Sequence, residues 1–169
     1  MHAHTKILTA IAATLALTAA ATADARQGSF KARGPNGVVA GKTGPNGTVV
    51  RGRGRVQNAD GSVTQRSGGA FQGTNGSSGK RASSTTVSPD GSVSRSGEAY
   101  VSGTNGSASS AGAFQRDADG NWSGSRSTTA TNNNTGNSYS GSTAINPATG
   151  KPVHSGTCTD ASGAVIPCR

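Results

Sequence analysis

Three short segments carry residue types that could bind a phosphate or a metal ion. GVVAGKT (37–43) is similar to a phosphate-binding loop, DADGN (117–121) is similar to a calcium loop, and His154 lies near Cys158 and Cys168. Each fails in its spacing. The phosphate loop needs four residues between its glycines and has three here, and no glutamate follows to complete a calcium loop. The spacing H-x3-C-x9-C matches no zinc module.

The side chains needed for acid–base or nucleophilic catalysis are scarce. Beyond residue 25 the only histidine is His154 and the only glutamate is Glu98. Serine is abundant, but a serine nucleophile needs a base within hydrogen-bond reach and a third group that orients the base. The sequence therefore predicts a protein that is not an enzyme, with no cofactor, no metal site and no small-molecule substrate.

A recurring turn signal predicts the elements that position the other side chains. Asn-Gly and Asp-Gly suit the two-residue turn between antiparallel strands, because both central residues of that turn need positive φ. Such a dipeptide, or a near equivalent, ends at Gly37, Gly47, Gly61, Gly76, Gly91, Gly106, Gly120, Gly136, Gly150 and Gly163. The sequence therefore predicts about nine to ten repeats of roughly 15 residues, joined by turns at these glycines.

Two segments repeat most closely. GSVTQRSGGAFQGTNGS (61–77) and GSVSRSGEAYVSGTNGS (91–107) agree at their ends, and their middles agree after an offset of one residue. Alternate units resemble each other because successive strands of a meander run in opposite directions. We expect the offset to be absorbed by a β-bulge near the central glycine, which would bend these long strands.

The composition favours β structure. No leucine follows Leu17, no methionine follows Met1, and Leu, Ile, Val and Phe make up about 11% of residues 26–169. No window offers an amphipathic helix, while the remaining valines and aromatic residues prefer strands. We predict an all-β fold, an antiparallel meander, with a β-solenoid or a partly disordered chain as alternatives.

The N-terminal segment has the pattern of a cleaved signal peptide. Residues 1–25 carry Lys6, an alanine-rich apolar run and small-residue cleavage sites after Ala23 or Ala25. The sequence predicts a signal helix and a secreted, periplasmic or cell-surface protein without a transmembrane span after its removal. The remaining chain divides into a basic lead-in (26–33), the repeat array (34–150) and a C-terminal hairpin cap (151–169).

The two cysteines predict a disulfide in that cap. Cys158 and Cys168 lie symmetrically about the turn glycine Gly163, so a hairpin would place them opposite each other. An exported protein can keep such a bond, because thiols are oxidised outside the cytoplasm. The bond would fasten the last strand of the array.

Positive charge is concentrated in the first half of the chain. Residues 26–81 hold ten Lys or Arg and one acid, Asp60, whereas residues 82–169 hold five of each sign. Such a basic region attracts polyanions. The candidate contact residues are Lys31, Arg33, Lys42, Arg51, Arg53, Arg55, Arg66, Lys80 and Arg81.

The repeated G-P-N-G, D-G-S-V-T and R-S-G elements make residues 34–163 similar to the low-complexity, signal-bearing repeat proteins of Gram-negative bacteria. The resemblance implies export and a repeat architecture but no activity. We expect a non-enzymatic structural or surface-interaction element of the cell envelope or extracellular matrix, pairing with itself through edge strands. The alternative is a cationic module that binds anionic polymers (polysaccharide, nucleic acid or anionic lipid head groups) through residues 26–81. Nucleic acid would bind without sequence specificity, since aromatic residues for base stacking are few.

Overall fold

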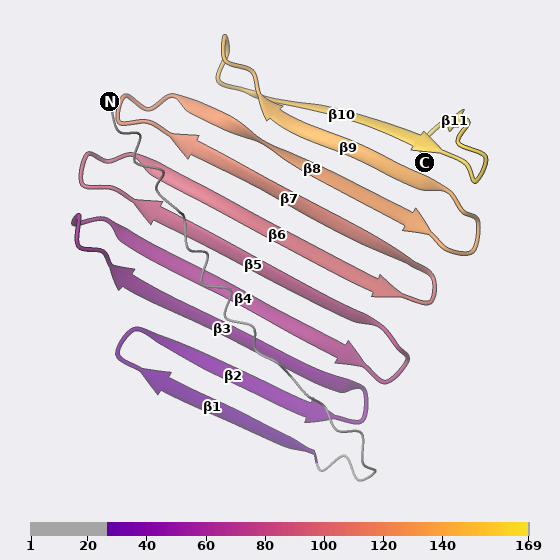
Figure 1. Cartoon of the computed structure of the whole chain (residues 1–169), viewed down its shortest axis with the longest axis horizontal. Helices are drawn as coiled ribbons and strands as arrows, with labels where there is room; N and C mark the ends of the chain where they lie inside the picture. The colour runs from indigo at the N-terminus through magenta and orange to yellow at the C-terminus, as the bar shows by residue number, and fades with distance from the viewer. Residues whose placement is uncertain (1–26, 169) are drawn as a thin grey trace, which may run out of the picture.

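The computed structural model describes residues 27–168 and shows one antiparallel sheet. Its eleven strands follow one another in chain order, so every strand contacts its sequence neighbours (Figure 1). They are β1 (Gly28–Gly34), β2 (Gly37–Gly44), β3 (Gly47–Gln57), β4 (Val63–Gly73), β5 (Ser78–Val87), β6 (Val93–Gly103), β7 (Gly106–Arg116), β8 (Trp122–Asn132), β9 (Ser138–Ile145), β10 (Pro152–Thr159) and β11 (Val165–Ile166). The prediction of an antiparallel meander is confirmed, and the solenoid alternative is wrong. The predicted signal peptide lies outside the described residues.

The strands run without interruption through their Ser-Gly pairs. β3, β4, β6, β7 and β8 are each 11 residues long, and one residue faces one residue along every ladder from β1 to β11. The expected bulge inside the repeat is therefore wrong. The one-residue offset between the two similar segments instead inverts the facing of their side chains, because that facing alternates at every residue.

Five of the hairpins close with a four-residue turn whose last residue is glycine. In each, the glycine N–H donates to the carbonyl three residues earlier, at 3.0–3.3 Å, and the glycine has positive φ. These glycines are Gly61, Gly76, Gly91, Gly120 and Gly163. In four of these turns the Asn or Asp before the glycine is thus the third residue, and before Gly163 that residue is Ser162. The sequence instead predicts the Asn-Gly or Asp-Gly pair at the centre of the turn. The observed turn is a type I turn extended by a left-handed glycine, which also matches the twist of a hairpin.

The other turns differ from this pattern. Gly136 and Gly150 have positive φ and donate to carbonyls four residues earlier. Gly37, Gly47 and Gly106 are the first residues of β2, β3 and β7, directly after two-residue loops. Of these three, only Gly47 has positive φ. The turn signal therefore located every hairpin but did not determine which residue of the turn the glycine would occupy.

Aspartates stabilise several of these turns. The Asp60 carboxylate accepts hydrogen bonds from the Ser62 hydroxyl (2.7 Å) and the Ser62 N–H (2.9 Å), which lowers the pKa of Asp60. Asp90 accepts from the Ser92 N–H, and its pKa is lowered in the same way. In the turn between β4 and β5, the Asn75 side-chain amide oxygen accepts the equivalent hydrogen bonds from the Ser77 N–H and hydroxyl.

Acid should weaken these turns. A carboxyl whose folded pKa is depressed contributes stability above its unfolded pKa and loses it as the pH falls through the folded pKa. We therefore expect the free energy of unfolding to decline below about pH 4. The decline should be smaller in the Asp60→Asn/Asp90→Asn variant, because an amide oxygen accepts the same bonds, as Asn75 does, and is not protonated by acid. Urea unfolding at pH 7 and pH 2.5, followed by circular dichroism, measures both. Equal declines in the two proteins would contradict a role for these carboxylates.

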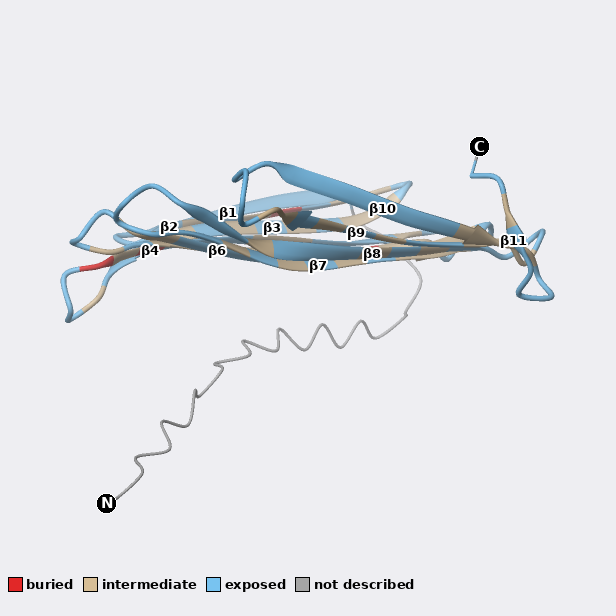
Figure 2. Cartoon of the chain, turned by 90° about the horizontal axis from the view of Figure 1, so that it is seen from above, coloured by how far each residue is buried: buried red, intermediate tan, exposed pale blue. Residues whose placement is uncertain are grey.

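The sheet is a single layer without a hydrophobic core in the described part of the chain (Figure 2). Among the described residues, the only buried polar side chains are those of Ser62 and Thr64. The Asn58 side-chain amide donates to both of their hydroxyls, at 2.8 and 2.9 Å, and the Thr64 hydroxyl lies 2.9 Å from that of Thr86. The sheet is therefore held together by its backbone ladders and by cross-strand side-chain pairs. Each such side-chain pair contributes about 0.2–1 kcal/mol.

A disulfide between Cys158 and Cys168 closes the C-terminal end, as predicted, with 5.3 Å between the two Cα atoms. The register differs from the expectation. Ile166 lies opposite Cys158, and Cys168 follows two residues later, so the cysteines are not partners in the ladder. The bond ties the segment after β11 back to β10.

Candidate functional site

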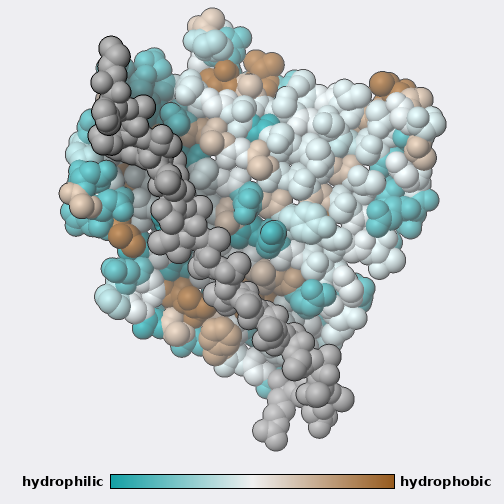
Figure 3. Space-filling view, in the orientation of Figure 1, coloured by the Kyte–Doolittle hydropathy of each residue, from teal (hydrophilic) through white to brown (hydrophobic). Residues whose placement is uncertain are grey.

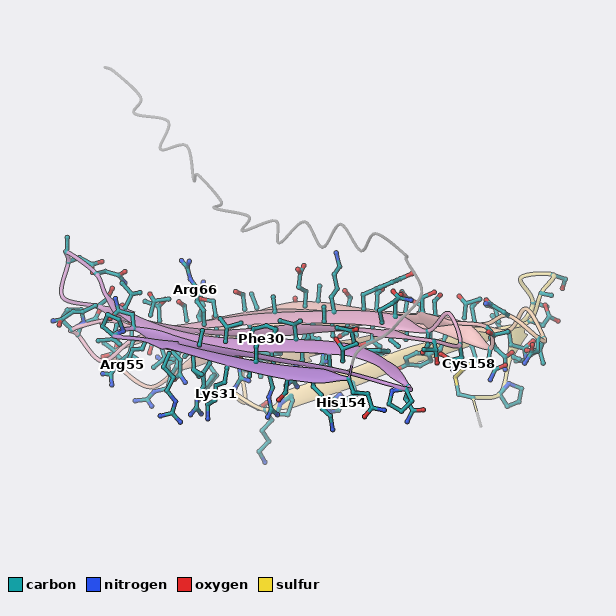
Figure 4. All side chains as sticks on the ribbon, turned by 90° about the horizontal axis from the view of Figure 1, so that it is seen from below. Phe30, Lys31, Arg55, Arg66, His154 and Cys158 are labelled. Atoms are coloured by element: carbon teal, nitrogen blue, oxygen red, sulfur yellow. A yellow bond between two sulfur atoms is a disulfide. The ribbon has the colours of Figure 1, made fainter. Side chains whose placement is uncertain are left out.

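One face of the sheet collects nearly all of its basic side chains. Arg51, Arg53 and Arg55 alternate with glycines along β3, so all three point to the same side. The ladder registers continue this face across the sheet, since paired residues share a face. We call it the cationic face; its basic residues are Lys31, Arg33, Lys42, Arg51, Arg53, Arg55, Arg81, Arg95, Arg116 and Arg126, all exposed. Figure 4 shows Lys31 and Arg55 on one side of the sheet and Arg66 on the other.

No acidic residue of the described strands shares this face. Glu98 pairs with Ala82 and Ala111 on the opposite face. Asp60, Asp90, Asp117, Asp119 and Asp160 lie in turns between strands. The Arg and Lys side chains therefore project from a surface on which no strand carboxylate neutralises them.

The basic residues are densest over β1 to β5. There an open depression of about 860 Å³ is lined by Lys31, Arg33, Arg51, Arg53, Arg55 and Arg81. Lys31, Ala40, Arg51, Gly69 and Arg81 form one row across five strands. Small residues thus separate the cations, which stand about 10 Å apart across the strands and about 7 Å apart along β3.

The second half of the sheet extends the same face. Arg95, Arg116 and Arg126 project from β6, β7 and β8, and Arg126 Nε donates to Ser110 Oγ at 2.6 Å. His154 also lies on this side, with its Nδ1 2.7 Å from the Thr143 hydroxyl. The charge distribution along the sequence does not select these residues, because acids and bases balance in residues 82–169. Their positions relative to the turns distinguish them. The acids of this half, apart from Glu98, lie in turns, whereas these arginines lie within strands.

Aromatic side chains lie near the strand ends of the cationic face. Phe71 and Tyr139 belong to one row, while Phe114 and Trp122 lie toward the opposite ends of the strands. Trp122 is 47% exposed and Phe71 is 41% exposed. The lining of the depression over β1 to β5 contains no aromatic residue. Phe30, which the sequence placed within the basic region, lies on the other face.

The opposite face, which we call the hydroxyl face, is covered by serine and threonine. Its hydroxyls pair across strands, with Ser109–Thr129, Ser138–Thr159 and Ser142–Ser155 each at 2.8 Å. On β6 to β10 it carries Ser94, Ser96, Ser102, Ser107, Ser109, Ser123, Ser125, Ser127, Thr129, Thr131, Ser138, Ser140, Ser142, Ser155, Thr157 and Thr159. In Figure 3, which views this face, side chains of near-neutral hydropathy cover most of its upper part.

The candidate contact residues from the sequence divide between the two faces. Seven of the nine lie on the cationic face, whereas Arg66 and Lys80 lie on the hydroxyl face. A one-residue offset explains Arg66: its counterpart in the later segment is Arg95, and the two point to opposite sides.

The phosphate-loop-like and calcium-loop-like segments have other roles in the structure. GVVAGKT is part of β2, an extended strand paired on both sides. In DADGN, the Asp117 carboxylate accepts hydrogen bonds from the Asn121 N–H (2.8 Å) and side-chain amide (2.9 Å) within its turn. Among the described residues, no three His, Cys, Asp or Glu side chains gather as metal ligands.

Comparison with known proteins gives no relative. No protein-family model matches the chain, and no curated protein or solved structure shows a significant match. Within residues 27–168 no helix is long and apolar enough to cross a membrane. The arrangement of the two faces is therefore the basis for a functional proposal.

Proposed function

We propose that this chain is an exported, non-enzymatic surface-interaction protein of the cell envelope or extracellular matrix that binds an anionic polymer across its cationic face. The observation that carries the proposal is the sidedness of the sheet: ten strand Lys and Arg residues share a face on which no strand carboxylate lies. A flat, regularly spaced array of cations suits a polymer, because many weak contacts add along one chain.

Among anionic polymers, the geometry favours an acidic polysaccharide. Single-stranded nucleic acids gain much of their affinity from bases stacked on aromatic rings. The depression formed by Lys31, Arg33, Arg51, Arg53, Arg55 and Arg81 has no aromatic lining. Carboxylates on a polysaccharide need only the charges and the hydrogen-bond donors of these side chains, which arginine presents as a planar fork.

A salt titration tests the proposal. We expect the protein to bind an acidic polysaccharide such as alginate at low salt and to lose affinity steeply as salt rises, because binding releases counterions. Dextran, a neutral polysaccharide, should not bind, and double-stranded DNA serves as the anionic comparison. Affinity for alginate that does not change between 20 and 300 mM salt, or equal affinity for dextran, would contradict an electrostatic contact face.

A further inference from the structure

The two edges of the sheet differ in the hydrogen-bonding groups that they offer. In the described chain, β1 pairs with β2 alone, and all seven of its residues are exposed. β10 pairs with β9 and, at Cys158 and Thr159 only, with β11. An open strand edge presents unpaired N–H and C=O groups to any strand that can align with it.

Hairpin geometry identifies which groups of β1 point outward. Gly34 and Gly37 close a two-residue loop, and such a closing pair exchanges both backbone hydrogen bonds. Hydrogen-bonded positions then alternate along β1, so that Ala32, Phe30 and Gly28 face β2. The N–H and C=O groups of Ser29, Lys31 and Arg33 therefore point away from the sheet, and none of these residues is a proline.

The β10 edge offers fewer free backbone hydrogen-bonding groups than the β1 edge. Asn146 N–H donates to the Lys151 carbonyl at 2.9 Å, which sets the alternation and leaves Pro152, His154, Gly156 and Cys158 facing outward. Proline has no N–H to donate, and Cys158 is already opposite Ile166 of β11. The disulfide fastens that cover in place. A strand that aligned with β10 would find only two consecutive outward-facing positions free.

We propose that β1 pairs with β1 of a second copy of this chain, about a two-fold axis perpendicular to the sheet. In this antiparallel register Lys31 lies opposite Lys31 of the second copy, and Ser29 lies opposite Arg33. Every outward-facing backbone group of β1 is then paired. On the hydroxyl face, Phe30, which is 54% exposed, lies opposite Ala32 of the second copy. Association through this contact stops at a dimer, because each copy uses the same edge and none is left for a third copy.

The charges of β1 oppose this pairing. Lys31 and Arg33 both lie on the cationic face, and a perpendicular two-fold axis keeps the cationic faces of the two copies on the same side. The two Lys31 side chains become direct cross-strand neighbours, and like charges in that position destabilise a pair. Basic residues on an edge strand are a known means of limiting association. Salt should therefore strengthen the dimer and weaken polymer binding. Because the two expected salt responses have opposite signs, either proposal can be contradicted without the other.

Sedimentation equilibrium of the purified protein tests this inference. We expect the wild-type dimer to become several-fold tighter between 20 and 500 mM salt, and Lys31→Ser to dimerise several-fold more tightly than wild type at 20 mM. Lys31→Pro and Arg33→Pro each remove one outward-facing donor and leave the ladder to β2 intact, so both should be monomeric with unchanged circular dichroism. Arg66→Ser, on the hydroxyl face, should behave as wild type.

Three results would overturn the inference: dimers of both proline variants as tight as wild type, association that weakens as salt rises, or monomeric wild type and Lys31→Ser at every salt concentration. A proline variant with altered circular dichroism is replaced by the other. If both are altered, the salt response and Lys31→Ser decide the question.

Discussion

Replacing Arg51, Arg53 and Arg55 together by serine should lower the affinity for an acidic polysaccharide by roughly 100-fold or more at 50 mM salt. These three residues line the depression on the cationic face and are exposed. The estimate follows from phosphate contacts of nucleic-acid-binding proteins, where each lost contact removes about one unit from the slope of log affinity against log salt. The salt slope should therefore decrease by about three.

A control on the other face separates position from net charge. The Arg66→Ser/Lys80→Ser variant removes two positive charges from the hydroxyl face. If net charge alone set the affinity, this variant would show about two thirds of the triple variant's loss on a logarithmic scale. We expect nearly wild-type affinity. Isothermal titration calorimetry with alginate compares the three proteins.

A second triple variant tests how far the contact surface extends. Arg95→Ser/Arg116→Ser/Arg126→Ser removes the basic residues of β6, β7 and β8, which charge counting along the sequence did not select. A long polymer that lies across the whole cationic face should lose affinity in this variant too. Unchanged affinity would restrict the contact surface to β1 through β5.

The largest expected effect on stability comes from Gly124→Ala. Gly124 lies within β8 with φ of 126°, a conformation that side chains disfavour. An added Cβ would also overlap the Ala113 carbonyl oxygen and lie 2.6 Å from the Phe114 Cα on β7. Backbone strain and strand displacement together should lower the free energy of unfolding by about 3 kcal/mol or more.

Two matched glycines separate these causes. Gly76 has φ of 80° with no atom within 4 Å of an added Cβ, so Gly76→Ala should cost only the backbone strain, about 1–2 kcal/mol. Gly34 has neither positive φ nor a nearby atom, so Gly34→Ala should be neutral or stabilise by up to about 1 kcal/mol. Urea unfolding followed by far-ultraviolet circular dichroism ranks the three. A loss in Gly124→Ala no larger than that in Gly76→Ala would show that the close approach of β7 and β8 is not rigid.

The sequence alone determined the type and order of the elements. The spacing of Asn-Gly and Asp-Gly located the hairpins, and a chain poor in leucine but containing valine favoured strands. These signals are local, since a turn depends on a few adjacent residues. Turn geometry was less predictable, because the same Asn-Gly pair suits both a two-residue loop and the last two positions of a longer turn. The symmetry of Cys158 and Cys168 predicted the disulfide correctly, although their ladder partners differ.

Part of the cationic face could also be read from the sequence. Arg51, Arg53 and Arg55 must share a face, because side chains in a strand alternate with a period of two. The same rule relates Lys31 to Arg33 within β1. It does not say whether β1, β3 and β8 present their charges on the same side, because that depends on how each strand aligns with the next.

Only the tertiary structure decided the composition of each face. Arg66 and Arg95 correspond in the two similar segments but lie on different faces of the sheet, and the same is true of Phe71 and Tyr100. A single-residue offset inverts the side to which a side chain points, and the registers of all the intervening ladders determine the final arrangement. The turn signals bring the strands together, whereas the register places ten basic residues on one side of the sheet and most of the hydroxyls on the other.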